Sequence, residues 1–341
     1  MPIEDRTRTG LVIDALKGAS VRAPYPWPMT IATTGQDVAD ETAAFNRELS
    51  ETLAAVPKFY EVDDPVVLRS GSGVFPPPVL LDQGCDRVVR GRAGGVPVRV
   101  FTPPEVNGVF VHLHPGGRVL GSARHQDLRL WTLAQAAKVA VVSVDYRLAP
   151  EHPDPAAVDD CEDVARWLVT NAESEFGTDR LVIGGESAGA ELSVHTLLRL
   201  RETGGQHRAF RAAYLAYGVY DMSQTPSARL AGESSPLAST RTERWFRAQA
   251  FPGLTAEELR DPAISPLYAD LRDLPPARFV VGTGDLLLDD TLFMSSRWQA
   301  AGNDAVLEVV AEAMHGFTAF PITVAERELA QQHKFVASAI A

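Results

Sequence analysis

The feature that most constrains the fold of this chain is one short apolar run. The run ends in paired glycines and passes directly into a helical pattern. Residues 181–190 read Leu-Val-Ile-Gly-Gly-Glu-Ser-Ala-Gly-Ala. The run is typical of a buried strand, and the spacing of Gly185, Ser187 and Gly189 predicts a sharp strand-to-helix turn. Glycine has no Cβ, so the backbone on both sides of the serine can approach its neighbours closely. We therefore expect Ser187 to occupy a strained turn at the end of a strand.

Around this turn, apolar runs alternate with helical patterns. The strands are expected at about 87–90, 96–101, 108–113, 139–144, 180–184, 212–217, 278–282 and 305–310, and the helices at about 122–137, 155–171, 188–203 and 290–301. The first two strands flank Gly94-Gly95 and predict a hairpin. Strands alternating with helices imply an α/β fold with a mostly parallel sheet of about eight strands and helices on both faces. The hairpin would form an antiparallel N-terminal edge.

Two segments lie outside this alternation and predict a helical cap on the main domain, residues 85–341. Residues 1–84 contain a helical pattern at about 37–56 and are expected to form a helical appendage. Residues 218–264 interrupt the domain and contain a short helical piece at 241–249. Long excursions inside a compact domain are usually functional. Because open α/β sheets bind ligands at the carboxyl ends of their strands, we expect both segments to cover that edge.

Composition excludes several classes of function. The formal net charge of -12, from 44 acidic and 32 basic residues, argues against nucleic acid or anionic lipid as a partner. No apolar run approaches the length of a membrane span, and the charged N-terminus lacks the apolar core of a signal peptide. Cys85 and Cys161 are too few for a disulfide framework or a thiolate metal site. The expectation is a cytoplasmic protein with free thiols.

The residues that could activate Ser187 follow later in the chain. A serine hydroxyl becomes a strong nucleophile when a base takes its proton and an acid holds that base. Asp285 directly follows a predicted strand. His315 follows the last predicted strand and precedes a glycine. Along the chain the three residues thus have the order Ser, Asp, His, which is the order in α/β-hydrolases. Asp289 and Asp290 compete for the role of the acid. They lie a helical turn later, where carboxylates more often stabilise a helix N-terminus, so Asp285 is favoured.

In acyl transfer the serine attacks a carbonyl carbon, and the carbonyl oxygen becomes negative. This oxygen requires hydrogen-bond donors. One donor is the backbone N–H of Ala188, directly after the nucleophile. Others should come from the loop after the strand at 108–113, where glycines allow a close backbone approach. Gly116 and Gly117 can donate, whereas Pro115 has no N–H.

Four more polar residues stand next to this chemistry in the sequence. His112 and His114 share one face of a strand, which makes a metal pair conceivable. Catalytic zinc takes three protein ligands and no third is apparent, so no metal is predicted. His114 is expected to hold a neighbouring loop by a hydrogen bond. Glu186 and Glu151 could act directly or form salt bridges that fix loops, and the second role is the commoner one near active sites.

Six segments of the chain match one protein family in combination. They are His114-Pro115-Gly116-Gly117, Val144–Pro153, Gly185–Gly189, Ser265-Pro266-Leu267, Gly284-Asp285 and Met314–Phe317. Over about residues 85–335 the chain resembles the hormone-sensitive-lipase-like microbial carboxylesterases. The resemblance implies an α/β-hydrolase fold, the catalytic triad Ser187, Asp285 and His315, and a cap from the two segments above. It also implies that Gly116, Gly117 and Ala188 are the oxyanion donors.

The chain departs from the family pattern at four places, one of which is Ala190, where the family has a further glycine after Gly189. Pro115 replaces the first glycine of the family's His-Gly-Gly-Gly, and Glu186 stands before the nucleophile. Residues 286–288 are three leucines where the family has a more polar stretch, which predicts an apolar pocket rim. These differences bear on substrate preference rather than on the type of reaction.

The sequence thus predicts a serine carboxylesterase that hydrolyses small, short-acyl esters through an acyl-enzyme, without a cofactor. A lipase, deacetylase or amidase would use the same residues on another substrate. Ligand receptors that resemble the family lack the catalytic histidine, which is present here as His315. The strand near 305–310 is expected at a sheet edge, through which two copies could pair as a homodimer.

Overall fold

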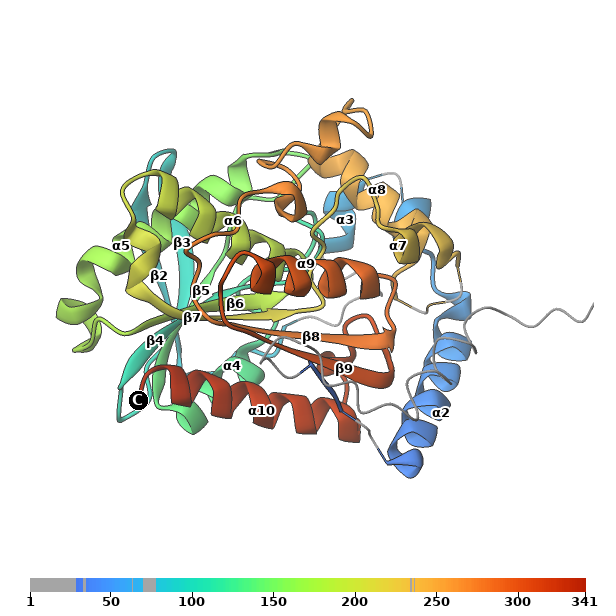
Figure 1. The fold of residues 1–341 in the computed structure, drawn as a ribbon, viewed down its shortest axis with the longest axis horizontal. Coiled ribbons are helices and arrows are strands. Elements are labelled where there is room, and N and C mark those ends of the chain that lie inside the picture. The colour runs from blue at the N-terminus through green and yellow to red at the C-terminus, as the bar shows by residue number, and fades with distance from the viewer. Residues whose placement is uncertain (1–28, 33–34, 63, 70–77, 234, 236) are drawn as a thin grey trace, which may run out of the picture.

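The computed structural model describes residues 29–32, 35–62, 64–69, 78–233, 235 and 237–341. In these residues nine strands form one sheet in the order β1-β9-β8-β7-β6-β4-β5-β3-β2 (Figure 1). They are β1 (Met29–Ala32), β2 (Gly84–Gly91), β3 (Gly94–Phe101), β4 (Gly108–Leu113), β5 (Val139–Val144), β6 (Leu181–Glu186), β7 (Phe210–Ala216), β8 (Ala277–Gly284) and β9 (Ala305–Met314). Only the pairs β2–β3 and β3–β5 are antiparallel. The predicted mostly parallel sheet with an antiparallel edge is confirmed.

Helices cover both faces of this sheet, as the alternation predicted. The α-helices of the described residues are α2 (Gln36–Thr52), α3 (Pro65–Arg69), α4 (Asp127–Ala137), α5 (Ala156–Phe176), α6 (Ala188–Glu202), α7 (Pro226–Leu230), α8 (Thr240–Ala250), α9 (Leu288–Ala300) and α10 (Thr323–Ala339). Helices α5, α6 and α9 pack on one face, and α4 and α10 on the other (Figure 1). None of the described helices combines the length and apolar composition needed to cross a membrane.

One sheet edge differs from the prediction. β9 does not lie at the edge, because β1 pairs with it in parallel, with Met29 opposite Leu307. The argument that β9 could pair with a second copy is therefore wrong, since its outer hydrogen-bonding side is already occupied. The segment expected to be helical thus also supplies a strand. Four residues are too short a run for a period of two to reveal a strand in the sequence.

The segments predicted to form the cap meet through an apolar cluster. It contains Leu68 of α3, Ala228 of α7, and Ala250 and Phe251 at the end of α8. These residues pack with loop residues that follow the carboxyl ends of β4, β5, β7 and β8, namely Val119, Leu120, Ala149, Val219, Met222, Leu286 and Leu287. Figure 1 shows α3, α7 and α8 gathered on one side of the molecule. Of the three leucines that were expected to make the pocket rim apolar, Leu286 and Leu287 are buried in this cluster, whereas Leu288 is partly exposed and packs against the core on another side.

A buried ion pair fastens the antiparallel edge to α4. The guanidinium of Arg99 donates to both carboxylate oxygens of Asp127, at 2.7 and 2.5 Å. Both side chains are almost completely excluded from solvent. A third nitrogen of the same guanidinium donates to Asp86 at 3.0 Å, and that carboxylate is half exposed. Arg99 therefore has one buried and one exposed acidic partner.

The substitution Asp127→Ala is expected to lower the free energy of unfolding by about 3–5 kcal/mol, because it leaves a buried guanidinium without its main counter-charge. Asp86→Ala removes the exposed partner of the same arginine and should cost less than about 1 kcal/mol. Urea unfolding of the two variants measures both values. Equal losses in the two variants would contradict the assignment of the stabilisation to the buried pair.

Candidate active site

The turn after β6 holds Ser187 in the conformation that the glycine spacing predicted. Its φ of 54° and ψ of -120° lie in a region that L-residues rarely adopt. A Cβ added to Gly185 or Gly189 would collide with the carbonyl oxygen of Leu113 at the end of β4. The two glycines therefore let the turn pack directly on the neighbouring strand, and the serine is presented at the carboxyl end of the sheet.

Two other strands bring an acid and a base to this serine. Asp285 directly follows β8, and His315 directly follows β9. Nε2 of His315 lies 3.0 Å from Oγ of Ser187, and Nδ1 lies 3.0 Å from each carboxylate oxygen of Asp285. The structure thus places all three predicted residues in one chain of hydrogen bonds, in an arrangement that can carry a proton away from the serine.

The surroundings of His315 favour its protonated form. Burial lowers the pKa of the imidazole, but the charge and hydrogen bond of Asp285 outweigh it and, with the charge of Glu243, raise this pKa above its usual value. The ring of Tyr217 meets the imidazole edge-on, with ring centroids 5.2 Å apart. The histidine is therefore held in place on two sides and is a stronger base than a histidine in water.

The competing acids serve a different purpose. Oδ1 of Asp290 accepts hydrogen bonds from the backbone N–H groups of Tyr220 and Asp221, at 2.7 and 2.9 Å. Burial raises the pKa of Asp290 to about 7. Asp289 accepts from the N–H of Ser227 at 2.8 Å. Both carboxylates thus anchor the start of the 218–264 insertion to the first turn of α9, and Asp285 is the acid that contacts the histidine.

The loop after β4 has the form expected of an oxyanion site. Gly116 and Gly117 have φ of 126° and 63°. A Cβ would collide with the carbonyl of Leu120 at the first position and with the ring of Phe246 from α8 at the second. No described residue accepts a hydrogen bond from the N–H of Gly116, Gly117 or Ala188. These donors are therefore available to a ligand.

His112 of β4 and His114, directly after this strand, have structural partners. His112 lies 2.8 Å from Oγ of Ser143 through Nδ1 and 3.2 Å from Glu186 through Nε2. His114 stacks on Tyr146 with ring centroids 4.0 Å apart, and its Nδ1 lies 2.9 Å from the carbonyl of Pro115. Burial lowers the pKa of His114 to about 3, so it is neutral. Among the described residues these histidines belong to no group that could hold a metal ion.

Glu186 lies at the centre of a buried network that the sequence did not reveal. Its carboxylate pairs with Arg129 of α4 at 2.6 Å, and Arg129 also donates to Thr318 at 3.2 Å, just after His315. Thr318 shares a hydrogen bond with Tyr217. This network links the turn that carries Ser187 to the loop that carries His315. Arg129 was missed because it lies far away in the chain and in no motif.

Glu151, the other acidic residue considered from the sequence, forms an ion pair with Arg69 of α3 at 2.7 Å. Its carboxylate is 42% exposed and lies among the loops rather than beside Ser187. It connects the N-terminal segment to the loop after β5, which is the loop-fixing role that is commoner for such residues.

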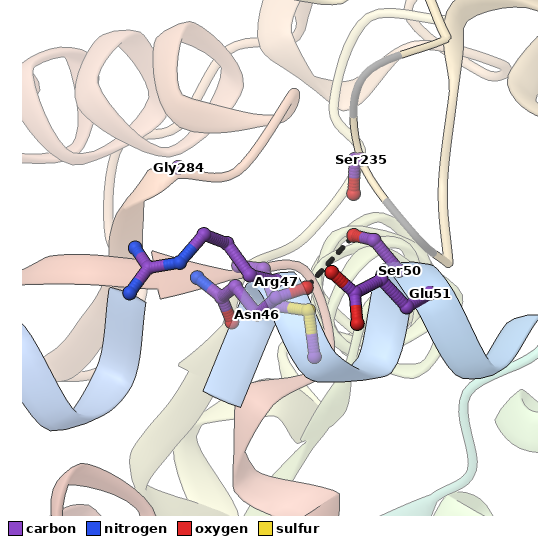
Figure 2. A pocket seen from close by; sticks show the side chains of 7 residues that line it. Asn46, Arg47, Ser50, Glu51, Ser235 and Gly284 are labelled. Carbon is purple, nitrogen blue, oxygen red and sulfur yellow. Dashed lines mark hydrogen bonds between the residues drawn. The ribbon is translucent and has the colours of Figure 1, made fainter. Parts of the chain in front are cut away.

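A cavity of about 430 Å³ lies beside the acid–base pair. It is lined by Asn46, Arg47, Ser50 and Glu51 of α2, by Ser235 of the insertion, and by Gly284 and Met314. Figure 2 shows the α2 side chains on one side, with Ser235 and Gly284 across from them. Gly284 and Met314 are the residues directly before Asp285 and His315. The cavity therefore adjoins the site from the side of α2, without including Ser187, Asp285 or His315.

Comparison with known proteins identifies the family. A model of the α/β hydrolase fold matches residues 110–319. The chain belongs to the α/β-hydrolase family. It is 34% identical to carboxylesterase NlhH of Mycobacterium tuberculosis over 236 residues, which is 67% of this chain and 73% of the other. It is 35% identical to ethyl acetate hydrolase of Pseudomonas putida over 234 residues, which is 65% of this chain and 71% of the other.

A solved structure supports the same assignment. The hyperthermophilic esterase of Pyrobaculum calidifontis superimposes with a TM-score of 0.77 at 28% identity, over 86% of this chain and 98% of the other. The resemblance to hormone-sensitive-lipase-like carboxylesterases that the motifs indicated is thereby confirmed. This α/β-hydrolase is a carboxylic ester hydrolase.

The buried carboxylate of Glu186 predicts a pH-dependent stability difference. Burial raises its pKa, but the charges of Arg129 and His112 outweigh this and lower it from 4.5 to about 2. A depressed pKa stabilises the folded state above pH 4.5 and loses that effect as the pH falls toward 2. The free energy of unfolding of wild type should therefore exceed that of Glu186→Gln by the largest amount above pH 4.5. This difference between the two proteins should shrink by about 3 kcal/mol as the pH falls toward 2.

Urea unfolding at several pH values checks this difference. Glu326→Gln, which removes a carboxylate from an exposed position of α10, is the matched control for the substitution itself. A gap for Glu186→Gln that stays constant through the acid range would show that this carboxylate does not titrate as proposed.

Proposed function

We propose that this hydrolase cleaves small, short-acyl carboxylic esters with Ser187 as nucleophile, His315 as general base and Asp285 as the acid that orients it. The observation that carries the proposal is the hydrogen-bond chain from Oγ of Ser187 through the imidazole to Asp285, with both links at 3.0 Å. Both distances lie within the range required for proton transfer.

The reaction follows from these contacts in two steps. Nε2 of His315 takes the proton of Ser187 as Oγ bonds to the ester carbonyl carbon, and Asp285 stabilises the imidazolium that forms. The carbonyl oxygen becomes negative and accepts hydrogen bonds from the free N–H groups of Gly116, Gly117 and Ala188. His315 then gives its proton to the departing alcohol and leaves an acyl-serine. His315 then takes a proton from a water molecule as the water oxygen bonds to the acyl carbon. The bond from this carbon to Oγ of Ser187 breaks, His315 returns the proton to Oγ, and the carboxylic acid leaves.

Two features support a preference for small substrates. The ring of Phe246, from helix α8 of the insertion, lies against Gly117 and so narrows the space beside the proposed oxyanion donors. One relative is named for ethyl acetate, an ester with a two-carbon acyl group. We therefore take the described parts of residues 1–84, together with the insertion 218–264, as a cap that limits the length of the acyl chain.

A p-nitrophenyl ester series with wild type and Ser187→Ala tests both parts of the proposal. Wild type should hydrolyse the acetate and butyrate well and the decanoate poorly, because the cap leaves little room. Ser187→Ala should lose at least about 10⁴-fold in kcat, since no other group can form the acyl-enzyme. Ser174→Ala, at an exposed position on α5, is the control and should keep the wild-type rate. Equal rates for wild type and Ser187→Ala would end the proposal.

The pH profile of kcat/KM tests the role of His315. The base must be neutral to accept a proton, so the rate should fall as the pH drops through its pKa. Because the pKa of His315 is raised above 6.5, mainly by Asp285 acting against burial, the acid limb should be centred above pH 6.5. Asp285→Asn should move this limb to lower pH and reduce kcat by about 10⁴-fold. A limb that does not move in this variant would disprove the coupling.

A further inference from the structure

Helix α8 carries an acidic side chain on the face that it turns toward the protein. Arg241, Arg244 and Ala248 mark the exposed face, whereas Thr242 and Ala250 are buried. Glu243 is half-buried and lies on the inner face, because residues at positions 243, 246 and 250 follow one another at helical spacing.

The same inner face covers the proposed oxyanion loop. Phe246 lies one helical turn after Glu243, and its ring lies where a side chain at Gly117 would have to go. Residues three apart on a helix are neighbours on its surface. Glu243 is therefore placed on the face of α8 that packs against the proposed oxyanion loop.

The carboxylate of Glu243 has no partner of its own. Among the described residues none forms a hydrogen bond or an ion pair with it. Arg247, four residues later, is the usual position for a helical ion-pair partner, but its guanidinium donates to the carbonyl of Met222 at 3.1 Å. Arg244 donates to Gln224 at 3.2 Å, and Arg241 lies over the ring of Tyr60. The cations of the helix are thus turned to other groups.

The charge of Glu243 acts on the site itself. Burial raises the pKa of this carboxyl, the charge of Asp285 raises it further, and the charges of His315 and Arg247 act in the opposite direction. In return, Glu243 is one of the groups that raise the pKa of His315. Glu243 lies in the first turn of α8, where the helix dipole favours a carboxylate, but no cationic side chain pairs with it. A positively charged ligand could therefore form an ion pair with it.

We propose that Glu243 is a specificity-determining residue that selects esters carrying a positively charged ammonium group near the scissile bond. The inference rests on the proposed function, because the ester must be bound at Ser187 for its charged end to meet the cap. It does not require Glu243 to take part in bond making or breaking.

Matched ester pairs test this selectivity. Butyrylcholine is compared with its neutral isostere, in which carbon replaces the quaternary nitrogen, to place the charge on the alcohol side. The p-nitrophenyl ester of γ-trimethylammoniobutyrate and its carbon isostere place it on the acyl side. For each pair, kcat/KM for the charged ester is divided by kcat/KM for the neutral ester. This ratio is then divided by the ratio of the rates of uncatalysed alkaline hydrolysis of the same two esters. The resulting normalised ratio no longer contains the difference in intrinsic reactivity between the two esters.

Wild type should show a normalised ratio of about ten or more for at least one pair, and the pair that responds identifies the side of the substrate that meets the cap. In Glu243→Gln the ratio should fall to near one, while kcat/KM for the neutral ester changes less than about twofold. Glu257→Gln removes the same charge from an exposed position of the insertion, 86% accessible, and should keep the wild-type ratio.

The pH dependence of the ratio gives a second readout in wild type alone. Protonation of His315, with Asp285 beside it, lowers kcat/KM for both members of a pair equally and therefore cancels in their ratio. A decline of the charged-over-neutral ratio on acidification thus reports protonation of the Glu243 carboxylate. A wild-type ratio of one or less, or equal losses for both members in Glu243→Gln, would overturn the inference. If wild type hydrolyses neither member of any pair, the proposed function itself fails, which is a distinguishable result.

Discussion

The hydrogen bond between Ser187 and His315 is the interaction on which the rest of this structure depends. It joins residues 128 positions apart, and the sheet order makes it possible. β6, β8 and β9 run parallel, so the residue that follows each strand emerges at the same edge. Ser187, Asp285 and His315 therefore meet there without any long excursion of the chain. Disturbing the register of any one strand would move one of the three groups out of reach.

Close packing holds that edge in place. The elbow around Ser187 fits only because two glycines allow it to touch the carbonyl of Leu113. The same compactness explains the loop of Gly116 and Gly117, where neighbouring atoms leave no room for a Cβ. The glycines of the motif thus serve contact between strands as much as the conformation of a turn.

Several buried charges in the described part of the chain form ion pairs. Arg99 pairs with Asp127, Arg118 with Glu191, and Arg129 with Glu186, and each pair ties one element to another. An uncompensated charge inside a protein is costly, which is why such groups come in pairs. The buried carboxylate of Asp290 has backbone N–H groups as partners instead. For the half-buried Glu243 the proposed partner is the substrate. The contrast between the paired charges and this carboxylate gives the cap a chemical character as well as a shape.

The sequence by itself determined the alternation of strands and helices, the turn at Ser187, and the strand ends that carry Asp285 and His315. These features are local, because they depend on apolar periodicity, on glycine and on order along the chain. Only the tertiary structure decided the partners of the buried charges, such as Arg129 for Glu186, and the pairing of β1 with β9. It also placed Glu243 on the partly buried face of α8 and gave Arg244 and Arg247 other partners. Such contacts join residues whose separation in the chain carries no pattern, so they exist only once packing has brought the elements together.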